Sequence, residues 1–307
     1  MSTLLPSARV RIDTGRCQGC GLCVALCPSR TFRLEDGLAR VTGAACIGCD
    51  HCAAICPAAA VSVEFIDPEA QRYASFVSDE NWLPPGDPAC DPSRLVQLMR
   101  SRRSCRCFKD KPVPRALLDD LVKIGITAPS GTNSQRWTFT VLPSRPSVEV
   151  LARGIGDFFR HVNSMAEKSW LRAAMKLAGK PDLDHYYHEY YTSVKAALAD
   201  FDRDGTDKLF HGAPATIVVG MRPGASCPAE DALLATQNIL LGAHCLGLGT
   251  CLIGYAVSAM ANDKKVKRTI DIPDNETVYA VIALGYPATR WERLTGRRTP
   301  VLRYFEG

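Results

Sequence analysis

The sequence predicts an α+β chain of two consecutive domains, and two observations support this prediction. The first is an internal repeat, in which one spacing of cysteines occurs twice between Cys17 and Cys56. The second is a change of pattern after Asp91, where apolar residues at helical spacing alternate with short apolar runs typical of buried strands. We therefore expect a small domain at residues 1–66, a linker at 67–91 and a larger domain at 92–307.

The composition is that of an ordinary globular protein and argues against several classes of function. Of the 307 residues, 46% are hydrophobic and 22% are charged. No run of roughly eighteen apolar residues occurs, and the N-terminus lacks the apolar core of a signal peptide, so we expect a cytoplasmic protein with no membrane partner. The net charge of +5 is scattered rather than gathered in blocks, so no nucleic-acid partner is expected.

The cysteine repeat is the strongest chemical signal in the sequence. Three thiolates spaced as C-x₂-C-x₂-C can bind three corners of a [4Fe–4S] cube from one loop, and a fourth Cys, followed by Pro, binds the other cluster of the pair. The two clusters are therefore expected to bind crossed sets of ligands. One set is Cys17, Cys20, Cys23 and Cys56, and the other is Cys46, Cys49, Cys52 and Cys27.

Zinc and disulfides are the alternatives for these cysteines. Paired C-x₂-C motifs also build zinc sites, but zinc leaves the third Cys of each triplet and the matched Cys-Pro unexplained. Disulfides are disfavoured because no secretory signal is present. Over residues 8–66 the segment resembles two-cluster bacterial ferredoxins, including the Cys46-Ile-Gly-Cys-Asp-His-Cys52 loop. The flanking short strands are expected at Val10–Ile12, Phe32–Leu34, Leu38–Val41 and Val61–Phe65.

The other cysteines are expected to be structural, with one exception to watch. Cys245 and Cys251 lie in apolar sequence, where a thiol acts as a small hydrophobe. Cys105 has basic neighbours that are expected to lower its pKa.

The larger domain shows helix starts and strand candidates in alternation. Asp91 or Ser93 is expected to cap one helix, and Pro114 to open a second. We expect strands at Trp137–Leu142, Ala215–Gly220 and Thr277–Gly285, and helical segments at about 150–212, 230–246 and 258–270.

Two polar segments of the larger domain suggest a bound phosphate and heterocycle. Arg102–Phe108 places three guanidiniums and a hydroxyl within five residues, and arginine binds phosphate through paired, charge-assisted hydrogen bonds. Ala128–Trp137 is a polar turn that leads into a strand. Taken singly, either segment is most often a solvated turn.

Together these segments resemble the nitroreductase family over about residues 92–307. The other matching features are an A-P-A-T strand, a helix that ends Leu246-Gly-Leu-Gly-Thr250 and a strand that ends Leu284-Gly-Tyr-Pro287, all in the family's order. The resemblance implies an FMN-dependent oxidoreductase that forms a homodimer with two flavin sites at the interface.

The resemblance also implies the roles of individual residues. Arg102 and Ser104, with Arg103 between them, face the FMN phosphate and ribityl chain. Arg106, the catalytic candidate, lies near N1 and O2 of the ring, where a cation stabilises the anionic reduced flavin. The other implied residues are Pro129, Ser130, Gly131 and Asn133 in a turn from the partner subunit, Ile253 and Gly254 near N5 and O4, and Arg297 and Arg298 near the phosphate. The sequence departs from the family at Arg136, where proline is usual.

The helical segment at 150–212 carries a run of aromatic residues from Asp184 to Tyr191. Spacing places Tyr186 and Tyr190 on one helical face and His185, with His188, on another. His185, Tyr186 and Tyr190 either line a substrate pocket or form a packing face.

The predicted function is electron transfer through the whole chain. No G-x-G-x-x-G follows a strand, so no Rossmann site for NAD is expected. Electrons are expected to pass from a donor such as reduced ferredoxin to the two clusters, to FMN, and to a small oxidised substrate such as a nitro, activated alkene, quinone or halogenated compound. The alternatives are direct reduction of FMN by NAD(P)H, and a redox sensor or electron carrier without a small-molecule substrate.

Overall fold

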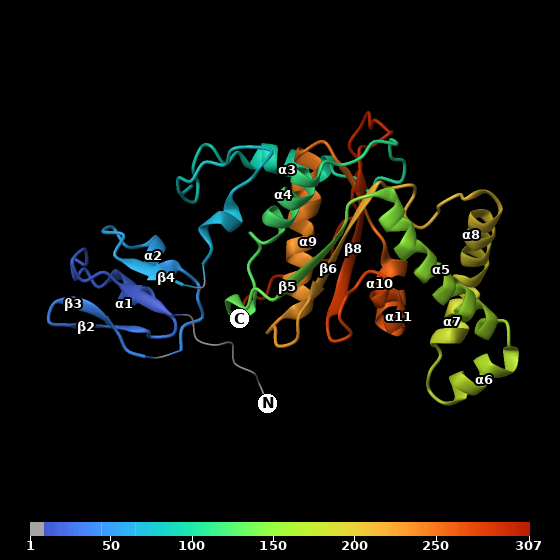
Figure 1. Cartoon of the computed structure of the whole chain (residues 1–307), viewed down its shortest axis with the longest axis horizontal. Helices are drawn as coiled ribbons and strands as arrows, with labels where there is room; N and C mark the ends of the chain where they lie inside the picture. Colours follow the sequence, from blue (N-terminus) through green and yellow to red (C-terminus); the bar gives the residue numbers. More distant parts are fainter. Residues whose placement is uncertain (1–8, 44, 65) are drawn as a thin grey trace.

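The fold was analysed in a computed structural model, which describes residues 9–43, 45–64 and 66–307. A small N-terminal domain lies at one end of the molecule, a four-stranded sheet with flanking helices occupies the middle, and an insert of helices lies at the other end (Figure 1).

The small domain is built from two pairs of short antiparallel strands. Strand β1 (Val10–Ile12) pairs with β4 (Val61–Val63), and β2 (Phe32–Glu35) pairs with β3 (Leu38–Val41). The four predicted strands are confirmed, with β2 one residue longer than predicted and β4 ending at Val63; the predicted end at Phe65 lies outside the described residues. Two short helices follow the first two cysteines of each repeat, namely α1 (Leu22–Leu26) and α2 (His51–Ala54).

The segment between the domains is fixed to the larger domain by a buried carboxylate. After a 3₁₀ turn at Pro68–Gln71, the chain crosses helix α4 (Arg115–Gly125), where Asp120 is fully buried. The Asp120 carboxylate accepts hydrogen bonds from Ala74 N at 2.8 Å, Ser75 N at 2.7 Å and Ser75 Oγ at 2.5 Å. Burial acts to raise the pKa of Asp120, but these hydrogen bonds outweigh it and hold the pKa below its ordinary value.

Replacing Asp120 with asparagine is expected to destabilise the protein by about 2–3 kcal/mol, since it leaves a buried N–H without an acceptor. Because the folded-state pKa of Asp120 is depressed, its contribution is fully present above the unfolded pKa and is lost as the pH falls through the folded pKa. Urea unfolding at several pH values measures both effects. Asp119→Asn, at an exposed neighbouring position, is the matched control. Equal stability of the two variants would contradict this account.

The sheet of the larger domain is antiparallel throughout, with strand order β5-β6-β8-β7. Its strands are β5 (Trp137–Leu142), β6 (Ala215–Met221), β7 (Gly249–Leu252) and β8 (Thr277–Gly285). All seven residues of β6 are buried, so the sheet is covered on both faces. The predictions of β5, β6 and β8 are confirmed to within one residue.

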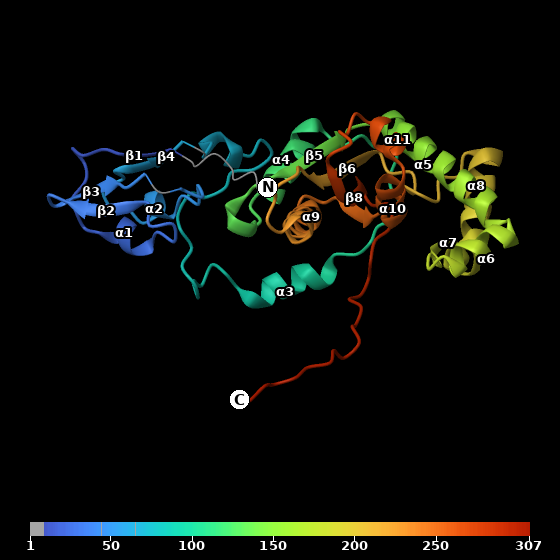
Figure 2. The ribbon, with the colours of Figure 1, turned by 90° about the horizontal axis from the view of Figure 1, so that it is seen from below.

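Alternate residues of the central strands enter two separate cores. Ile217 and Val219 pack with α4 and α9 (Pro228–Cys245) on one face, whereas Val218 packs on the other face. The helices of that second face are α5 (Arg145–Ala166), α10 (Gly254–Asn262) and α11 (Lys264–Arg268). The result is a helix–sheet–helix sandwich, which Figures 1 and 2 show from two sides.

The helical predictions are confirmed in outline and corrected in detail. The insert contains α5, α6 (Ser169–Leu177), α7 (Asp182–Glu189) and α8 (Tyr191–Asp204), with a break at Tyr190. The predicted helix at 258–270 is two helices, because the side chain of Asp263 accepts a hydrogen bond from Lys265 N and caps α11. Strand β7 is absent from the predictions.

Three elements leave apolar surface uncovered within the chain. Helix α3 (Pro92–Ser101), capped by Asp91, has no buried residue and contacts the sandwich only along one side, at α9 (Figure 2). Helix α9 exposes Leu233 and Leu234 at 50% and 45%. After β8 the chain leaves the body as an extended tail, which exposes Val301, Tyr304 and Phe305. Among the described residues, no helix has the length and apolar character needed to cross a bilayer.

Candidate functional site

The eight cysteines of the repeat are gathered around two small cavities in the small domain. The first, called cavity I here, is lined by Cys17, Cys20, Cys23 and Cys56. The second, called cavity II, is lined by Cys27, Cys46, Cys49 and Cys52. Each cavity thus brings together three cysteines of one repeat and the last cysteine of the other, which is the crossed arrangement expected from the sequence.

The surroundings of the thiols suit a cluster held by thiolates. Backbone N–H groups of Thr31, Gly48 and Ala60 donate to the sulfurs of Cys27, Cys46 and Cys56, each at 3.3 Å. Such bonds stabilise negative charge on cluster thiolates. The four thiols of each set surround one cavity, as four ligands at the separate corners of a cube require.

Burial affects the thiols unequally. It raises the pKa of Cys52 to about 11 and also raises the pKa of Cys23. Hydrogen bonds from the backbone of Ala39 and Gly19 lower the pKa of Cys17. Iron binding deprotonates such thiols outright, so the buried pair depends on the metal for its thiolate form.

The arginine segment runs along the edge of the sheet beside β7. Ser104 forms a parallel bridge with Thr250, and Cys105 N donates to Thr250 O at 2.8 Å. On its other side, Cys107 O accepts from Ala288 N at 2.8 Å. The segment Arg102–Arg106 therefore lies between the end of β7, which leads into Ile253 and Gly254, and the start of the C-terminal tail.

The guanidiniums of this segment have no acidic partner among the residues that the structure describes. Burial lowers the pKa of Arg102, and the positive charges of Arg103 and Arg297 lower it further. Among the described residues, no salt bridge joins Arg102, Arg103, Arg106, Arg297 or Arg298 to a carboxylate. Arg103 Nε is buried without a hydrogen-bond partner, while its Nη1 donates to Thr295 Oγ1. Uncompensated guanidiniums with a free buried N–H are the donor set that a phosphate requires.

Arg106, for which the resemblance implies a place beside the flavin ring, lies next to β7. Its charge acts on Cys251 of β7 and on His211. Burial lowers the pKa of His211 below its ordinary value, and the Arg106 charge adds to this effect. Arg106 is exposed, so its charge is available to a bound group. Arg298 is exposed in the tail and makes no contact with the segment among the interactions described.

The predicted turn residues lie elsewhere, against the N-terminal end of α9. Gly131 N donates to Asp231 Oδ1 at 2.8 Å, and Ser134 Oγ donates to Asp231 Oδ2 at 3.3 Å. A Cβ on Gly131 would lie 2.9 Å from Cys227 Sγ, so only glycine fits there without a shift. The turn is strained, with φ of 52° at Thr132, 54° at Asn133 and 45° at Gln135.

Within one chain the turn and the arginine segment are far apart. The turn is bound to Asp231 in the first turn of α9, whereas Arg102 acts electrostatically on His244 in its last turn. At 1.5 Å per residue, the thirteen steps from Asp231 to His244 span about 20 Å. The structure therefore does not bring Pro129, Ser130, Gly131 and Asn133 to the arginine segment of the same chain.

The turn instead contacts the small domain, which the sequence did not indicate. Asn133 Nδ2 donates to Gly48 O at 2.9 Å and to Ile47 O at 3.3 Å. Gln135 Nε2 donates to Asn133 Oδ1 at 3.1 Å and so fixes the orientation of the amide. Ile47 and Gly48 lie between Cys46 and Cys49, in the loop that lines cavity II.

The aromatic rings of the insert contact one another and helix α5. Tyr186 OH donates to Asn163 Oδ1 at 2.7 Å, and its ring stacks on Phe159 with centroids 6.2 Å apart. The ring of Tyr190 contacts those of His185 and Tyr186 at centroid distances of 5.8 and 6.3 Å. Both interpretations of this run were open from the sequence, and these contacts favour packing.

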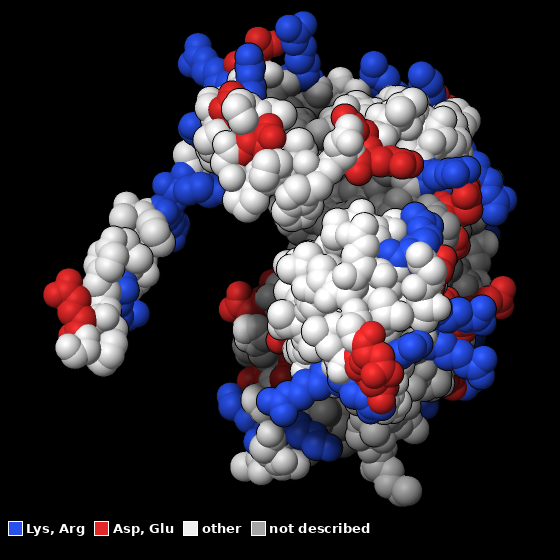
Figure 3. Space-filling view, turned by 90° about the vertical axis from the view of Figure 1, so that its left-hand side faces the viewer, with Lys and Arg blue, Asp and Glu red and all other residues white. Residues whose placement is uncertain are grey.

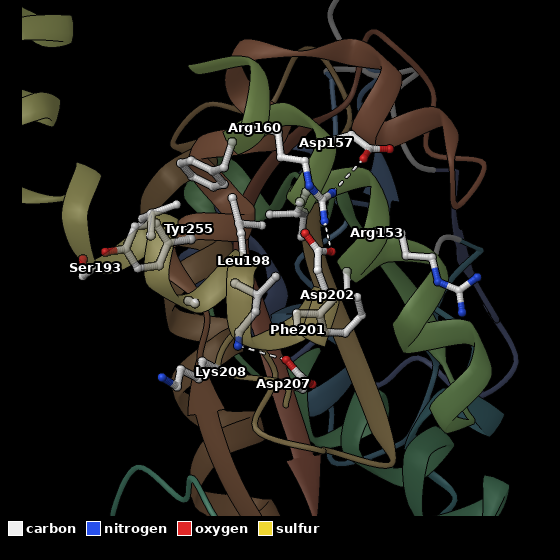
Figure 4. Close-up of a pocket in the computed structure, with 17 residues that line it drawn as sticks. Arg153, Asp157, Arg160, Ser193, Leu198, Phe201, Asp202, Asp207, Lys208 and Tyr255 are labelled. Atoms are coloured by element: carbon white, nitrogen blue, oxygen red, sulfur yellow. Dashed lines mark hydrogen bonds and ion pairs between the residues drawn. The ribbon is translucent and has the colours of Figure 1, made fainter. Parts of the chain in front are cut away.

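A larger groove of about 580 Å³ lies nearby, between α5 and α8. Its walls are apolar residues such as Leu198 and Phe201, and at its rim Arg160 pairs with Asp157 at 3.0 Å and Asp202 at 2.5 Å (Figure 4). Tyr255, which follows Gly254, also lines the groove. His185, Tyr186 and Tyr190 are not among its lining residues.

Cys105 and Arg136, two residues singled out in the sequence, both lie away from a reactive role. Cys105 is buried, and burial raises its pKa, so the expectation of a thiol activated by basic neighbours is wrong. Arg136, which stands where the family has proline, donates to Pro223 O at 2.6 Å and packs beside Gly224. Its charge is thus directed at the β6–α9 loop.

Thiol-lined cavities in one domain and an arginine segment suited to binding phosphate in the next define an iron–sulfur oxidoreductase. A model of the nitroreductase family matches residues 99–286, and a 4Fe–4S dicluster domain matches residues 9–57. The chain belongs to the nitroreductase family, and its N-terminal domain is a ferredoxin domain with four-iron clusters. The predicted fold class, FMN-dependent enzyme class and cofactors are thereby confirmed.

Individual relatives are distant. A 4-nitrobenzoate reductase of Nocardioides sp. is 28% identical over 62% of this chain and 78% of its own length. Iodotyrosine deiodinase 1 of Rattus norvegicus is 34% identical over 63% of this chain and 62% of its own length. A solved nitroreductase with bound FMN from Bacteroides fragilis is 20% identical, with a TM-score of 0.49, over 68% of this chain and 98% of its own.

Proposed function

We propose that this enzyme passes electrons from a one-electron donor through its two four-iron clusters to FMN, and from FMN to a small oxidised substrate. The observation that carries the proposal is the hydrogen bond from Asn133 to Gly48, since it joins the loop of a cluster cavity to the turn implied in flavin binding. The division into a ferredoxin domain at 1–66, a linker at 67–91 and a reductase domain at 92–307 belongs to the same proposal.

Arg102, Arg103 and Arg297 are the residues that would bind the FMN phosphate, because they share uncompensated positive charge. Ser104 would add a hydroxyl, and Arg106 would hold a positive charge beside the ring, where reduced flavin carries its negative charge. When bound, FMN couples the single electrons of the clusters to the two-electron reduction of an organic substrate.

A homodimer would complete the flavin site, which needs both an arginine segment and a turn. One chain separates the turn from the arginine segment by about 20 Å along α9, so a complete site needs a turn from another copy. Apolar side chains uncovered in one chain supply a surface for that copy, on α3, on α9 and on the tail. Obligate interfaces are extensive and apolar in this way.

The substrate class is proposed from the family and its relatives. By their names, one relative reduces a nitroaromatic compound and another removes iodine from an aromatic ring. Nitro, activated alkene, quinone and halogenated compounds are therefore the candidates. The ferredoxin side of the molecule offers a broad area without charged side chains, on which a protein donor can dock (Figure 3).

The experiment is an anaerobic comparison of electron donors. Flavin bleaching is followed by absorbance after mixing with reduced ferredoxin, NADH or NADPH. We expect reduced ferredoxin to bleach the flavin at least ten times faster than either nicotinamide. Faster bleaching by NADH or NADPH would identify a nicotinamide-dependent nitroreductase instead. Bleaching by ferredoxin with no turnover of any candidate substrate would indicate an electron carrier.

A further inference from the structure

We infer that cavity II is the electron exit of the ferredoxin domain, and that this exit serves the FMN held by the arginine segment of the second chain rather than of its own. The inference rests on the proposed function, because it assigns a route to the electrons that the enzyme moves. It specifies that the cluster of cavity II donates the electrons and that the electrons cross from one chain to the other.

The contacts of Gly48 identify the exit. Gly48 N donates to Cys46 Sγ at 3.3 Å, and Gly48 O accepts from Asn133 Nδ2 at 2.9 Å. One peptide residue therefore links a thiol of cavity II to the turn through two hydrogen bonds. The Cys17–Cys23 loop of cavity I has no such link. Within the residues that the structure describes, no hydrogen bond joins it to residues 67–307.

The position of the turn identifies the receiving chain. The turn is bound to Asp231 at one end of α9, and the arginine segment lies at the other end, near His244. A flavin on the arginine segment is thus out of reach of its own turn and meets the turn of the second chain. Since the ferredoxin domain is attached to the turn, each flavin faces the ferredoxin domain of the other chain.

Two anchors hold each ferredoxin domain on its own turn. Asp120 fixes the connecting segment through Ala74 and Ser75, and Asn133 fixes the cavity II loop. The Asn133 amide is itself oriented by Gln135. Asn133 has a left-handed backbone conformation, with φ of 54°, which asparagine adopts more readily than most residues. These contacts keep the ferredoxin domain from swinging to its own arginine segment.

The transfer is balanced as two single-electron steps. Each step would oxidise one reduced four-iron cluster by one electron, and two steps would supply the two electrons that reduce one FMN, with the accompanying proton taken from solvent. The external one-electron donor reduces the clusters again.

Mixed dimers of two differently tagged full-length chains test the route. In the first, a chain with Arg102→Glu, which loses its flavin, is paired with a chain with Cys49→Ser, which loses its cavity II cluster. In the second, both substitutions are in one chain and the other chain is wild type. Each mixed dimer is expected to contain one FMN, measured by absorbance after extraction, so the two samples differ only in which chain holds which defect.

Transfer between chains predicts opposite results for the two mixed dimers. With reduced ferredoxin as donor, the first is expected to bleach its single flavin at the wild-type rate, and the second at least 100-fold more slowly. The reverse order, equal rates in both, or slow bleaching in both would overturn the inference. Equal bleaching by the wild-type and Cys49→Ser homodimers would instead contradict the proposed function, since no electrons would then pass through the clusters.

Amide hydrogen exchange tests the exit without electron transfer and without FMN. In protein stripped of flavin, Asn133→Ala is expected to raise exchange at residues 46–50 at least tenfold and to leave residues 17–23 unchanged. Thr132→Ala, in the same turn, is the matched control and is expected to have no effect at residues 46–50. Unchanged exchange there in Asn133→Ala would show that the turn does not hold the cavity II loop, and the assignment of the exit would fall.

Discussion

Cys56→Ser is expected to remove the cluster of cavity I, although Cys56 belongs to the second cysteine repeat. Wild-type protein should contain about eight iron atoms and eight labile sulfides per chain, and the variant about half of each. The reason is the crossed arrangement, in which Cys56 lines one cavity with Cys17, Cys20 and Cys23. Iron and sulfide analysis of anaerobically purified protein measures the loss, and flavin bleaching by reduced ferredoxin should fall at least 100-fold.

Cys90→Ser is the matched control for this variant, because Cys90 is exposed in the linker and lines neither cavity. It is expected to retain all of the iron. Stoichiometric zinc without labile sulfide in the wild-type protein would show that the cysteines bind zinc. A Cys56→Ser protein with its full iron content would show that the ligand sets are not crossed.

Arg106→Gln is expected to make bound FMN harder to reduce. Glutamine retains hydrogen-bonding capacity but removes the cation that stabilises the negative charge of reduced flavin. A loss of about 1–3 kcal/mol in a partly dry site corresponds to a two-electron potential about 20–65 mV more negative. Spectroelectrochemical titration of the purified variant measures the shift. FMN affinity should change much less than the potential.

Arg297→Gln is the control variant, because Arg297 is proposed to bind the phosphate rather than to lie beside the ring. Arg297 shares positive charge with Arg102, so its loss is expected to weaken FMN binding about tenfold, the effect of one charge-assisted hydrogen bond. The potential of the flavin that remains bound should not move. If Arg106→Gln bound FMN poorly at an unaltered potential, Arg106 would belong with the phosphate residues instead.

The sequence predicted those elements whose pattern is local. Strand β5 begins and ends at the predicted residues, because Trp137–Leu142 is an apolar run bounded by polar turns. Strand β7 was missed because its first residues, Gly249 and Thr250, belong to the motif that ends the preceding helix, so that only the pairing with β8 shows it to be a strand. The break at Tyr190 was equally invisible, because neither Gly nor Pro marks it.

The candidate site was predictable to the same extent. Repeated spacing revealed the cysteines, and family motifs suggested the arginine segment and the turn. Which of these meet in one chain is a tertiary property, set by the two ends of α9 and by the contact between Asn133 and Gly48. Cys105 shows the limit of local reasoning, since its basic neighbours in sequence count for less than its burial.

The small core of the ferredoxin domain makes iron supply a condition for its folding. Among the described residues, its buried apolar side chains apart from the thiols are Phe32, Ala39, Ala60, Val61 and Val63. A core of this size does not hold a domain without cross-links, and the clusters are those cross-links. Chains made in iron-starved cells are therefore expected to keep a folded reductase domain and an N-terminal segment that proteases remove. Nutritional iron would then decide whether the enzyme can accept electrons from a protein donor at all.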